Sequence, residues 1–171
     1  AAAAQAAGRL AGEIVPIQAN GHMVEADGCI RPETSQEALS GLKPAFGKNG
    51  TVTAASSSSI SDGAAAVVIA SAAYAAEHGL KPLARIASFA DAEQDPAWFT
   101  TSPTVAAPLA LKRAGLTKND IDFYEVNEAF SVVTLAFEKL MEISHDQTNV
   151  FGGAVSLGHP LGASGARIVT T

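Results

Sequence analysis

The chain has 171 residues, of which 47% are hydrophobic and 16% charged, which suffices for one globular domain or for a domain with parts of a neighbour. Its formal net charge is -6 at pH 7 and Lys and Arg do not cluster, so the charge pattern argues against a nucleic-acid-binding protein. A single cysteine, Cys29, excludes an internal disulfide framework, and no apolar run approaches the ~20 residues of a membrane-spanning helix.

The first half of the chain is predicted to be mostly irregular. From Glu13 to Thr51, Gly, Pro, Asn and Asp recur at short intervals, as they do in loops. The serine run Ser56–Ser59 is expected to form an ordered turn, since apolar segments flank it closely. The run Ala64–Ala70 lacks polar alternation, which favours a buried parallel strand, with a helix as the alternative. A helix is predicted from Ser71 to His78, with Ser71 as its N-cap.

The second half of the chain alternates between the two element types. Strands are predicted from short apolar runs at Leu83–Phe89, Ile121–Val126 and Asn149–Val155. Helices are predicted from apolar residues at helical spacing at Val105–Ala114, Glu128–Ile143 and Ala163–Thr170. Pro108 is expected in the first turn of its helix, where a missing N–H costs little. This alternation predicts a layered α/β fold with buried strands.

One histidine lies in a glycine-rich segment near the end of the chain. His159 is expected on a strand-to-helix turn, where Gly158 lets the backbone bend and Pro160 holds His159 extended. The glycines could instead make a tight connection or a dinucleotide site, but their GxxxGxxG spacing differs from GxGxxG. On the residues alone, a functional His159 and a packing or capping histidine are equal alternatives.

Two further blocks carry polar or aromatic candidates. The first is Val126–Phe130, in which the Asn127 amide can hold a water molecule or simply cap the following helix. The second runs from Leu42 to Gly63, where Phe46 is read as a core aromatic and Ser58 as a turn residue unless they bind a ligand.

Together these blocks resemble the thiolase family. The segment around His159 is similar to the thiolase GHP signature, Val126–Phe130 to its NEAF motif, and Leu42–Gly63 to the stretch that ends the thiolase loop domain. The resemblance implies part of a layered αβαβα fold, in which helices cover a mixed buried sheet. It also implies acyl transfer between coenzyme A thioesters.

The resemblance assigns a role to each candidate residue. His159 and Asn127, with a water held by Asn127, would form an oxyanion hole for a thioester carbonyl. The coenzyme A and acyl-pantetheine wall would be lined by Phe46, Ser58, Ala129 and Phe130. Gly158 and Pro160 would support the turn. The chain has Ser56 where thiolases commonly have Asn and Ser59 where they commonly have Gly, so which serine meets the ligand stays open.

Thiolases also use two cysteines, and neither is present. Cys29 matches neither position and is expected to be structural or incidental, so we expect this chain alone to be inactive. The leading hypothesis is an acetyl-CoA C-acetyltransferase. The alternatives are a 3-ketoacyl-CoA thiolase of fatty-acid degradation, a non-catalytic acyl-CoA-binding or assembly fragment, and a nucleotide-binding α/β domain.

The resemblance also predicts organisation and partners. Residues 1–59 would end the loop domain, 60–82 would close the N-terminal domain, and 83–171 would form part of the C-terminal domain. Coenzyme A thioesters would be substrates, with no cofactor, no metal and no nucleic acid, and the complete enzyme would be a homodimer or homotetramer. The cytoplasm is the favoured compartment, with the mitochondrion and the peroxisome as alternatives. The remaining histidines are expected at the surface: His22, His78 and His145.

Overall fold

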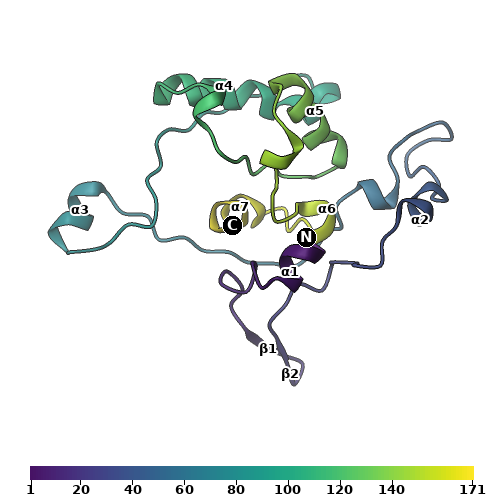
Figure 1. Cartoon of the computed structure of the whole chain (residues 1–171), viewed down its shortest axis with the longest axis horizontal. Coiled ribbons are helices and arrows are strands. Elements are labelled where there is room, and N and C mark those ends of the chain that lie inside the picture. Colours follow the sequence, from purple (N-terminus) through teal and green to yellow (C-terminus); the bar gives the residue numbers. More distant parts are fainter.

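The computed structural model describes residues 1–171 and contains more helix than strand. Seven α-helices occur in chain order: α1 (Ala2–Ala6), α2 (Gln36–Ser40), α3 (Ala72–Glu77), α4 (Pro103–Ala114), α5 (Ser131–Met141), α6 (Ala154–Leu157) and α7 (Ser164–Thr170). Short 3-10 turns cover Ala54–Ser56, Pro96–Thr101, Lys118–Asp120 and His145–Gln147. Figure 1 shows α4 and α5 together at the top, α6 and α7 in the centre, and α3 on an extended arm.

The small core lies beneath α5. Val126, Val133 and Phe137 are buried together, and the Tyr124 ring meets the Phe137 ring edge-on at a centroid separation of 5.5 Å. Val133 and Phe137 are four residues apart and therefore share one face of the helix. This packing fixes the start of α5 against the segment that leads into Asn127.

The two proline positions of α4 differ from the sequence prediction. The helix begins at Pro103, which takes the first helical position, so the expected start at Val105 is two residues late. Pro108 therefore lies inside the helix rather than in its first turn. The C-terminus is as predicted, because Gly115 adopts the left-handed conformation with φ 71°. Ser71 also caps α3 as predicted, accepting a hydrogen bond from the Tyr74 N–H.

The predicted buried strands do not form. The segments 64–70 and 83–89 have no regular secondary structure, and Val68 and Leu83 are fully exposed. A strand requires a neighbouring strand to pair its N–H and C=O groups, and neither segment has one. Segment 83–89 lies against α4 instead, where Ser88 donates to the Ala110 carbonyl and Arg113 donates to the Phe89 carbonyl. At 121–126, pairing is limited to one parallel bridge, between Tyr124 and Thr148.

The only sheet is an antiparallel hairpin in the segment predicted to be irregular. Strand β1 (Ile17–Ala19) pairs with β2 (His22–Val24), with Ala19 opposite His22. The turn is Asn20-Gly21, and both residues have positive φ, at 51° and 80°. This conformation is that of a tight hairpin turn for which Asn-Gly is the favoured sequence.

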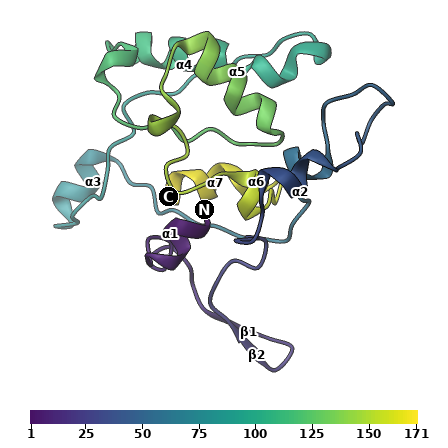
Figure 2. The same cartoon turned by 45° about the vertical axis from the view of Figure 1, so that its right-hand side comes forward.

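The strand predicted at Asn149–Val155 is replaced by a turn and the short helix α6. Asn149 is left-handed with φ 47°, and Gly152 has φ 103°, which prevents an extended run. His159 consequently lies between two helices, α6 and α7, rather than between a strand and a helix. Helix α7 itself is as predicted. Figures 1 and 2 both place α6 and α7 between the α4–α5 pair and the β1–β2 hairpin.

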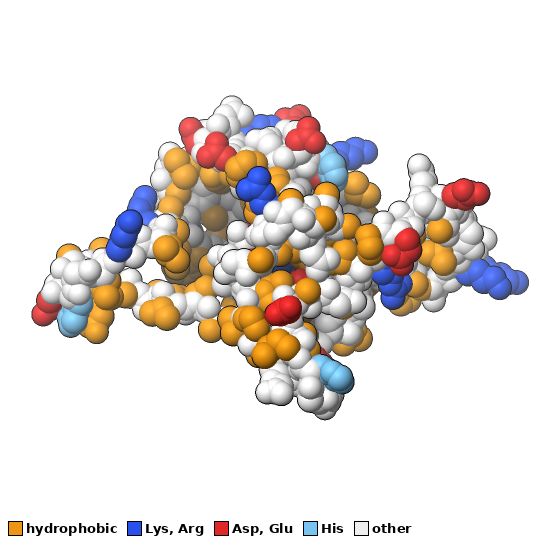
Figure 3. Space-filling model, turned by 60° about the horizontal axis from the view of Figure 1, so that its bottom comes forward, with side chains coloured by type: hydrophobic (Ala, Val, Ile, Leu, Met, Phe, Trp, Pro, Cys, Tyr) orange, Lys and Arg blue, Asp and Glu red, His pale blue; other side chains and the backbone are white.

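Much apolar surface is open to solvent. Only 13 of 171 residues are buried, and large side chains such as Ile60, Val68 and Phe89 are mostly exposed. Figure 3 shows hydrophobic side chains spread across the viewed face and along the arm that carries α3. A chain with this exposure has many apolar groups left to cover by association. No helix combines the length and apolar character needed to cross a bilayer.

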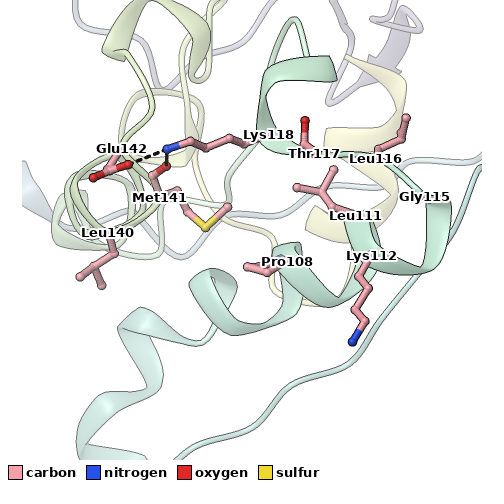
Figure 4. A pocket seen from close by; sticks show the side chains of 10 residues that line it. All are labelled: Pro108, Leu111, Lys112, Gly115, Leu116, Thr117, Lys118, Leu140, Met141 and Glu142. Carbon is pink, nitrogen blue, oxygen red and sulfur yellow. Dashed lines mark hydrogen bonds and ion pairs between the residues drawn. The ribbon is translucent and has the colours of Figure 1, made fainter.

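A shallow pocket separates α4 from the end of α5. The Lys118 ammonium donates to the Met141 carbonyl at 3.0 Å and pairs with the Glu142 carboxylate at 2.7 Å (Figure 4). The Lys118 ammonium holds the pKa of Glu142 below its usual value. A cation at this position also complements the negative end of the α5 dipole. The contacts of Lys118 therefore tie the turn that follows α4 to the C-terminal end of α5.

Candidate active site

The backbone around His159 is held by the serine segment from the first half of the chain. The His159 N–H donates to the Ser59 carbonyl at 2.9 Å, within a parallel bridge between Ile60 and His159. Gly158 has φ 89°, and a methyl group there would overlap the Ser61 hydroxyl. Only glycine fits this conformation and this close approach. Gly158 and Pro160 thus flank His159 as the sequence suggested.

Ser164 orients the imidazole. Its hydroxyl lies 2.6 Å from His159 Nδ1 and donates to the Pro160 carbonyl at 3.1 Å. We assign the imidazole proton to Nδ1, which then donates to Ser164 Oγ, because the Asn127 amide nitrogen faces Nε2 and can only donate to it. The Nε2 lone pair then receives only the long contact from Asn127 and can act as a base. Ser164 was not predicted from the sequence, although it lies only five residues after His159 in the GHP segment.

Asn127 lies on the other side of the imidazole. Its Nδ2 is 3.4 Å from His159 Nε2, a long hydrogen bond in which the amide donates. Its Oδ1 is buried and accepts no hydrogen bond from the protein. Asn127 does not cap α5, because Phe130 occupies the N-cap position. The structure thus excludes the capping alternative and leaves an unpaired acceptor beside His159.

The charge near Asn127 is unevenly distributed. Burial raises the pKa of Glu125, the neighbouring Arg167 guanidinium lowers it by a smaller amount, and the carboxylates of Glu13 and Glu128 raise it. The Nε and one terminal nitrogen of Arg167 are buried without hydrogen-bond partners. The Arg167 guanidinium therefore offsets part of the charge of the Glu125 carboxylate without forming a salt bridge with it.

Ser58 connects the serine segment to the Asn127 segment. Its N–H and its hydroxyl both donate to the Ala129 carbonyl, at 3.1 and 2.9 Å. The adjacent Ser57 pairs with Phe130 in an antiparallel bridge. Ser58 and Ala129 are therefore in contact, and the Ser58 hydroxyl proton is already used within the protein.

Three aromatic rings gather beside this junction. Phe130 meets Phe46 edge-on at 6.2 Å between ring centroids and Phe99 at 6.4 Å. Phe46 is 78% exposed and Phe99 53%, so both rings are open to a ligand. Phe46 and Phe130 were predicted from the sequence as part of this wall, whereas Phe99 was not. The only signal for Phe99 was the aromatic pair Trp98-Phe99 within an otherwise polar connection.

Cys29 lies close to Gly158, the residue before His159. Its sulfur is 3.8 Å from the Ser61 hydroxyl and 3.9 Å from that of Ser59, both weak contacts. The thiol makes no hydrogen bond with His159. The geometry is that of a packing thiol, consistent with the structural role expected from the sequence.

Among the other histidines, His145 pairs with Glu138 at 2.9 Å and His78 stacks on Tyr74. Both are exposed, and so is His22. In this structure no three His, Cys, Asp or Glu side chains group closely enough to hold a metal ion.

Comparisons with known proteins identify the family. The model of the thiolase N-terminal domain matches residues 1–73, and that of the thiolase C-terminal domain matches residues 80–171. The division into 1–59, 60–82 and 83–171 stays a prediction.

Individual relatives agree with these family models. The chain is 56% identical over 130 residues, 76% of its length, to a probable acetyl-CoA acetyltransferase of Dictyostelium discoideum. It is 51% identical over 173 residues, 96% of its length, to a 3-ketoacyl-CoA thiolase of Marinobacter nauticus. These matches cover 31% and 44% of the two relatives, so the chain spans less than half of their length.

A solved structure shows the same fold. Human mitochondrial 3-ketoacyl-CoA thiolase in complex with CoA superposes with a TM-score of 0.92 and 42% identity, covering 99% of this chain and 43% of that one. This confirms the predicted thiolase-like α/β fold in part of its extent, although the buried sheet is not formed within this chain. With the GHP and NEAF residues in contact and both family models matched, the chain belongs to the thiolase family.

Proposed function

We propose that this chain forms the oxyanion and coenzyme A side of an enzyme that transfers acetyl groups between coenzyme A thioesters. The observation that carries the proposal is the approach of Asn127 Nδ2 to His159 Nε2 at 3.4 Å, with Asn127 Oδ1 buried and unpaired. Two polar groups fixed side by side can together stabilise a negative charge that develops next to them.

The chemistry follows from the assigned state of His159. Nε2, whose lone pair receives only the 3.4 Å contact from Asn127, can take the proton of a nucleophilic thiol, and the protonated Nε2 can then donate to the thioester oxygen. Asn127 Oδ1 can accept from a water that donates to the same oxygen. The thiols would come from the two cysteines that thiolases use and that this chain lacks.

The aromatic group supports a coenzyme A ligand. Phe46, Phe99 and Phe130 offer apolar faces to the pantetheine arm and to a short acyl group. Ser58 would act through its backbone link to Ala129, because its hydroxyl proton is engaged there. The CoA complex of the human relative supports the same ligand for this chain.

A second candidate is thiolysis of longer 3-ketoacyl-CoA thioesters. It is supported by the 51% identity with the Marinobacter nauticus relative, which is similar in strength to the 56% match over a shorter stretch. Turnover of acetoacetyl-CoA against 3-ketohexanoyl-CoA by a complete subunit that carries these residues would separate the two activities.

Assembly is proposed on the exposed apolar surface. The rest of each subunit, together with a partner subunit in a homodimer or homotetramer of the complete enzyme, would cover side chains such as Ile60 and Val68. Light scattering coupled to size-exclusion chromatography would give the oligomeric state, and a monodisperse monomer would contradict the proposal.

Calorimetric titration tests the ligand class directly. The 171-residue chain is expected to bind coenzyme A and not NAD, and His159→Ala is expected to retain binding, since His159 acts on the thioester rather than on the nucleotide. Binding of NAD alone would replace the proposal with a nucleotide-binding domain. In a complete subunit, His159→Ala should lower kcat at least ~100-fold. The chain alone should not cleave acetoacetyl-CoA, and activity would refute our reading of Cys29.

A further inference from the structure

The side chain of Asn149 pairs with the backbone of Val126 as a neighbouring strand would. Its Oδ1 accepts from the Val126 N–H at 2.7 Å, and its Nδ2 donates to the Val126 carbonyl at 2.8 Å. Asn149 is buried and left-handed with φ 47°, which turns the side chain toward Val126. Both backbone groups of the residue before Asn127 are thereby satisfied by one amide.

The carboxylate of Glu128 fixes the residue after Asn127. One oxygen accepts from the Asn149 amide at 3.2 Å, and the other accepts from the Val155 N–H, in the first turn of α6, at 3.2 Å. The first oxygen also receives the Thr134 hydroxyl at the longer distance of 3.5 Å. A methyl group at Gly153 would overlap this carboxylate, so the approach to α6 depends on glycine there.

These contacts join the two sides of the site. Asn127 lies between Val126 and Glu128, both of which are held by Asn149. Glu128 also binds the first turn of α6, and that helix ends at Leu157, two residues before His159. The distance between Asn127 and His159 is therefore set through a short path of hydrogen bonds.

We propose that Asn149 and Glu128 are positioning residues that fix Asn127 against His159. The catalytic role of Asn127 and His159 rests on the proposed function. The claim that Asn149 and Glu128 hold Asn127 against His159 does not. A displacement of about 1 Å at a reacting group can cost ~100-fold in rate. By holding Asn127 in place, the hydrogen bonds of Asn149 and Glu128 would therefore affect the rate of the reaction.

Exchanging the hydrogen-bond donor and acceptor between Asn149 and Glu128 tests whether this contact positions Asn127. In Asn149→Asp, the acceptor for the Val126 N–H remains, whereas the donor to Val126 and to Glu128 is lost and two carboxylates face each other. Adding Glu128→Gln to this variant returns an amide donor and removes the repulsion. The double variant is therefore expected to recover part of the geometry that the single variant loses.

The measurement is the nitrogen resonance of His159 Nε2 in the isotope-labelled 171-residue chain, followed by long-range proton–nitrogen spectra. Asn127→Ala serves as the reference for losing the amide beside Nε2. Asn149→Asp is expected to move the Nε2 resonance in the same direction, and the double variant is expected to move it back. Glu138→Gln is the matched control, since Glu138 lies on α5 and pairs with the exposed His145 in the turn that follows the helix, away from the Asn127 site.

Two outcomes would overturn the inference. One is an Nε2 resonance in Asn149→Asp that stays at the wild-type position, and the other is a folded double variant that moves no closer to wild type. If Asn149→Asp does not fold, the single variant Glu128→Gln is the test. An unchanged His159 Nε2 resonance in Glu128→Gln would then contradict the inference. Coenzyme A titration of the same samples reports separately on the proposed function.

Discussion

The Ser164 hydroxyl stands between His159 Nδ1 and the Pro160 carbonyl, accepting from the first at 2.6 Å and donating to the second at 3.1 Å. This arrangement makes the imidazole a base at Nε2 rather than at Nδ1. The hydroxyl is buried, so neither of its partners can readily exchange it for solvent.

Ser164→Ala is expected to release the tautomer of His159. Without the acceptor at Nδ1, both tautomers should be populated, and the free energy of unfolding should fall by about 1 kcal/mol for the lost hydrogen bonds. Nitrogen spectra of the imidazole measure the tautomer ratio. Ser40→Ala, which removes an exposed hydroxyl with one backbone contact, should change neither quantity. A single unchanged tautomer in Ser164→Ala would contradict the assignment.

Gly153→Ala is expected to destabilise the protein by about 2 kcal/mol or more, because the added methyl group would expel the Glu128 carboxylate from its bonds to Asn149 and Val155. Thermal unfolding followed by circular dichroism measures the effect. Gly162→Ala is the control, since nothing lies within 4 Å of its added carbon. Equal melting temperatures for the two variants would show that the close approach is not required.

Phe46→Ala is expected to weaken coenzyme A binding about fivefold, equivalent to ~1 kcal/mol, because the ring offers an open face beside Phe130. Phe89→Ala is a closely matched control. Phe89 is 76% exposed and Phe46 is 78% exposed, but Phe89 contacts no ring of the site. Calorimetric dissociation constants would decide, and equal losses in the two variants would remove Phe46 from the binding wall.

Glu125→Gln is expected to raise stability at neutral pH. Burial raises the pKa of Glu125 in the folded state above the unfolded value of about 4.3, so the folded protein holds its proton more tightly. Its contribution to stability is therefore full below about pH 4.3 and is lost as pH rises through the folded pKa. Urea unfolding at several pH values should show a smaller decline across this window in Glu125→Gln. A decline of unchanged size would assign it to another group.

The local signals of the sequence predicted the caps at Ser71 and Gly115 correctly, the first turns of α4 and α5 less well, and the strands poorly. Ser71 and Gly115 specify caps through their own backbone preferences, which need no distant partner. An apolar run such as 64–70 becomes a strand only when another strand pairs with it, and that information is not local. The hairpin around Asn20-Gly21 carried a favourable turn signal that the loop-like composition of its surroundings obscured.

The candidate site divides in the same way. His159 and Asn127 could be proposed because each lies in a distinctive motif, and their contact confirms that the two motifs meet. Phe99 and Asn149 lie outside those motifs and reach the site across many intervening residues. The position of Phe99 depends on how it packs against Phe130, and that of Asn149 on its own left-handed conformation. Neither can be predicted from the residue type alone.

The serine segment holds both motifs at once. Ser58 binds the Ala129 carbonyl, Ser57 pairs with Phe130, and the Ser59 carbonyl receives the His159 N–H. This segment falls within the part matched by the N-terminal family model, whereas both motifs fall within the C-terminal one. Separation of the two parts would therefore free the His159 N–H and the Ala129 carbonyl, one in each motif, at the same time.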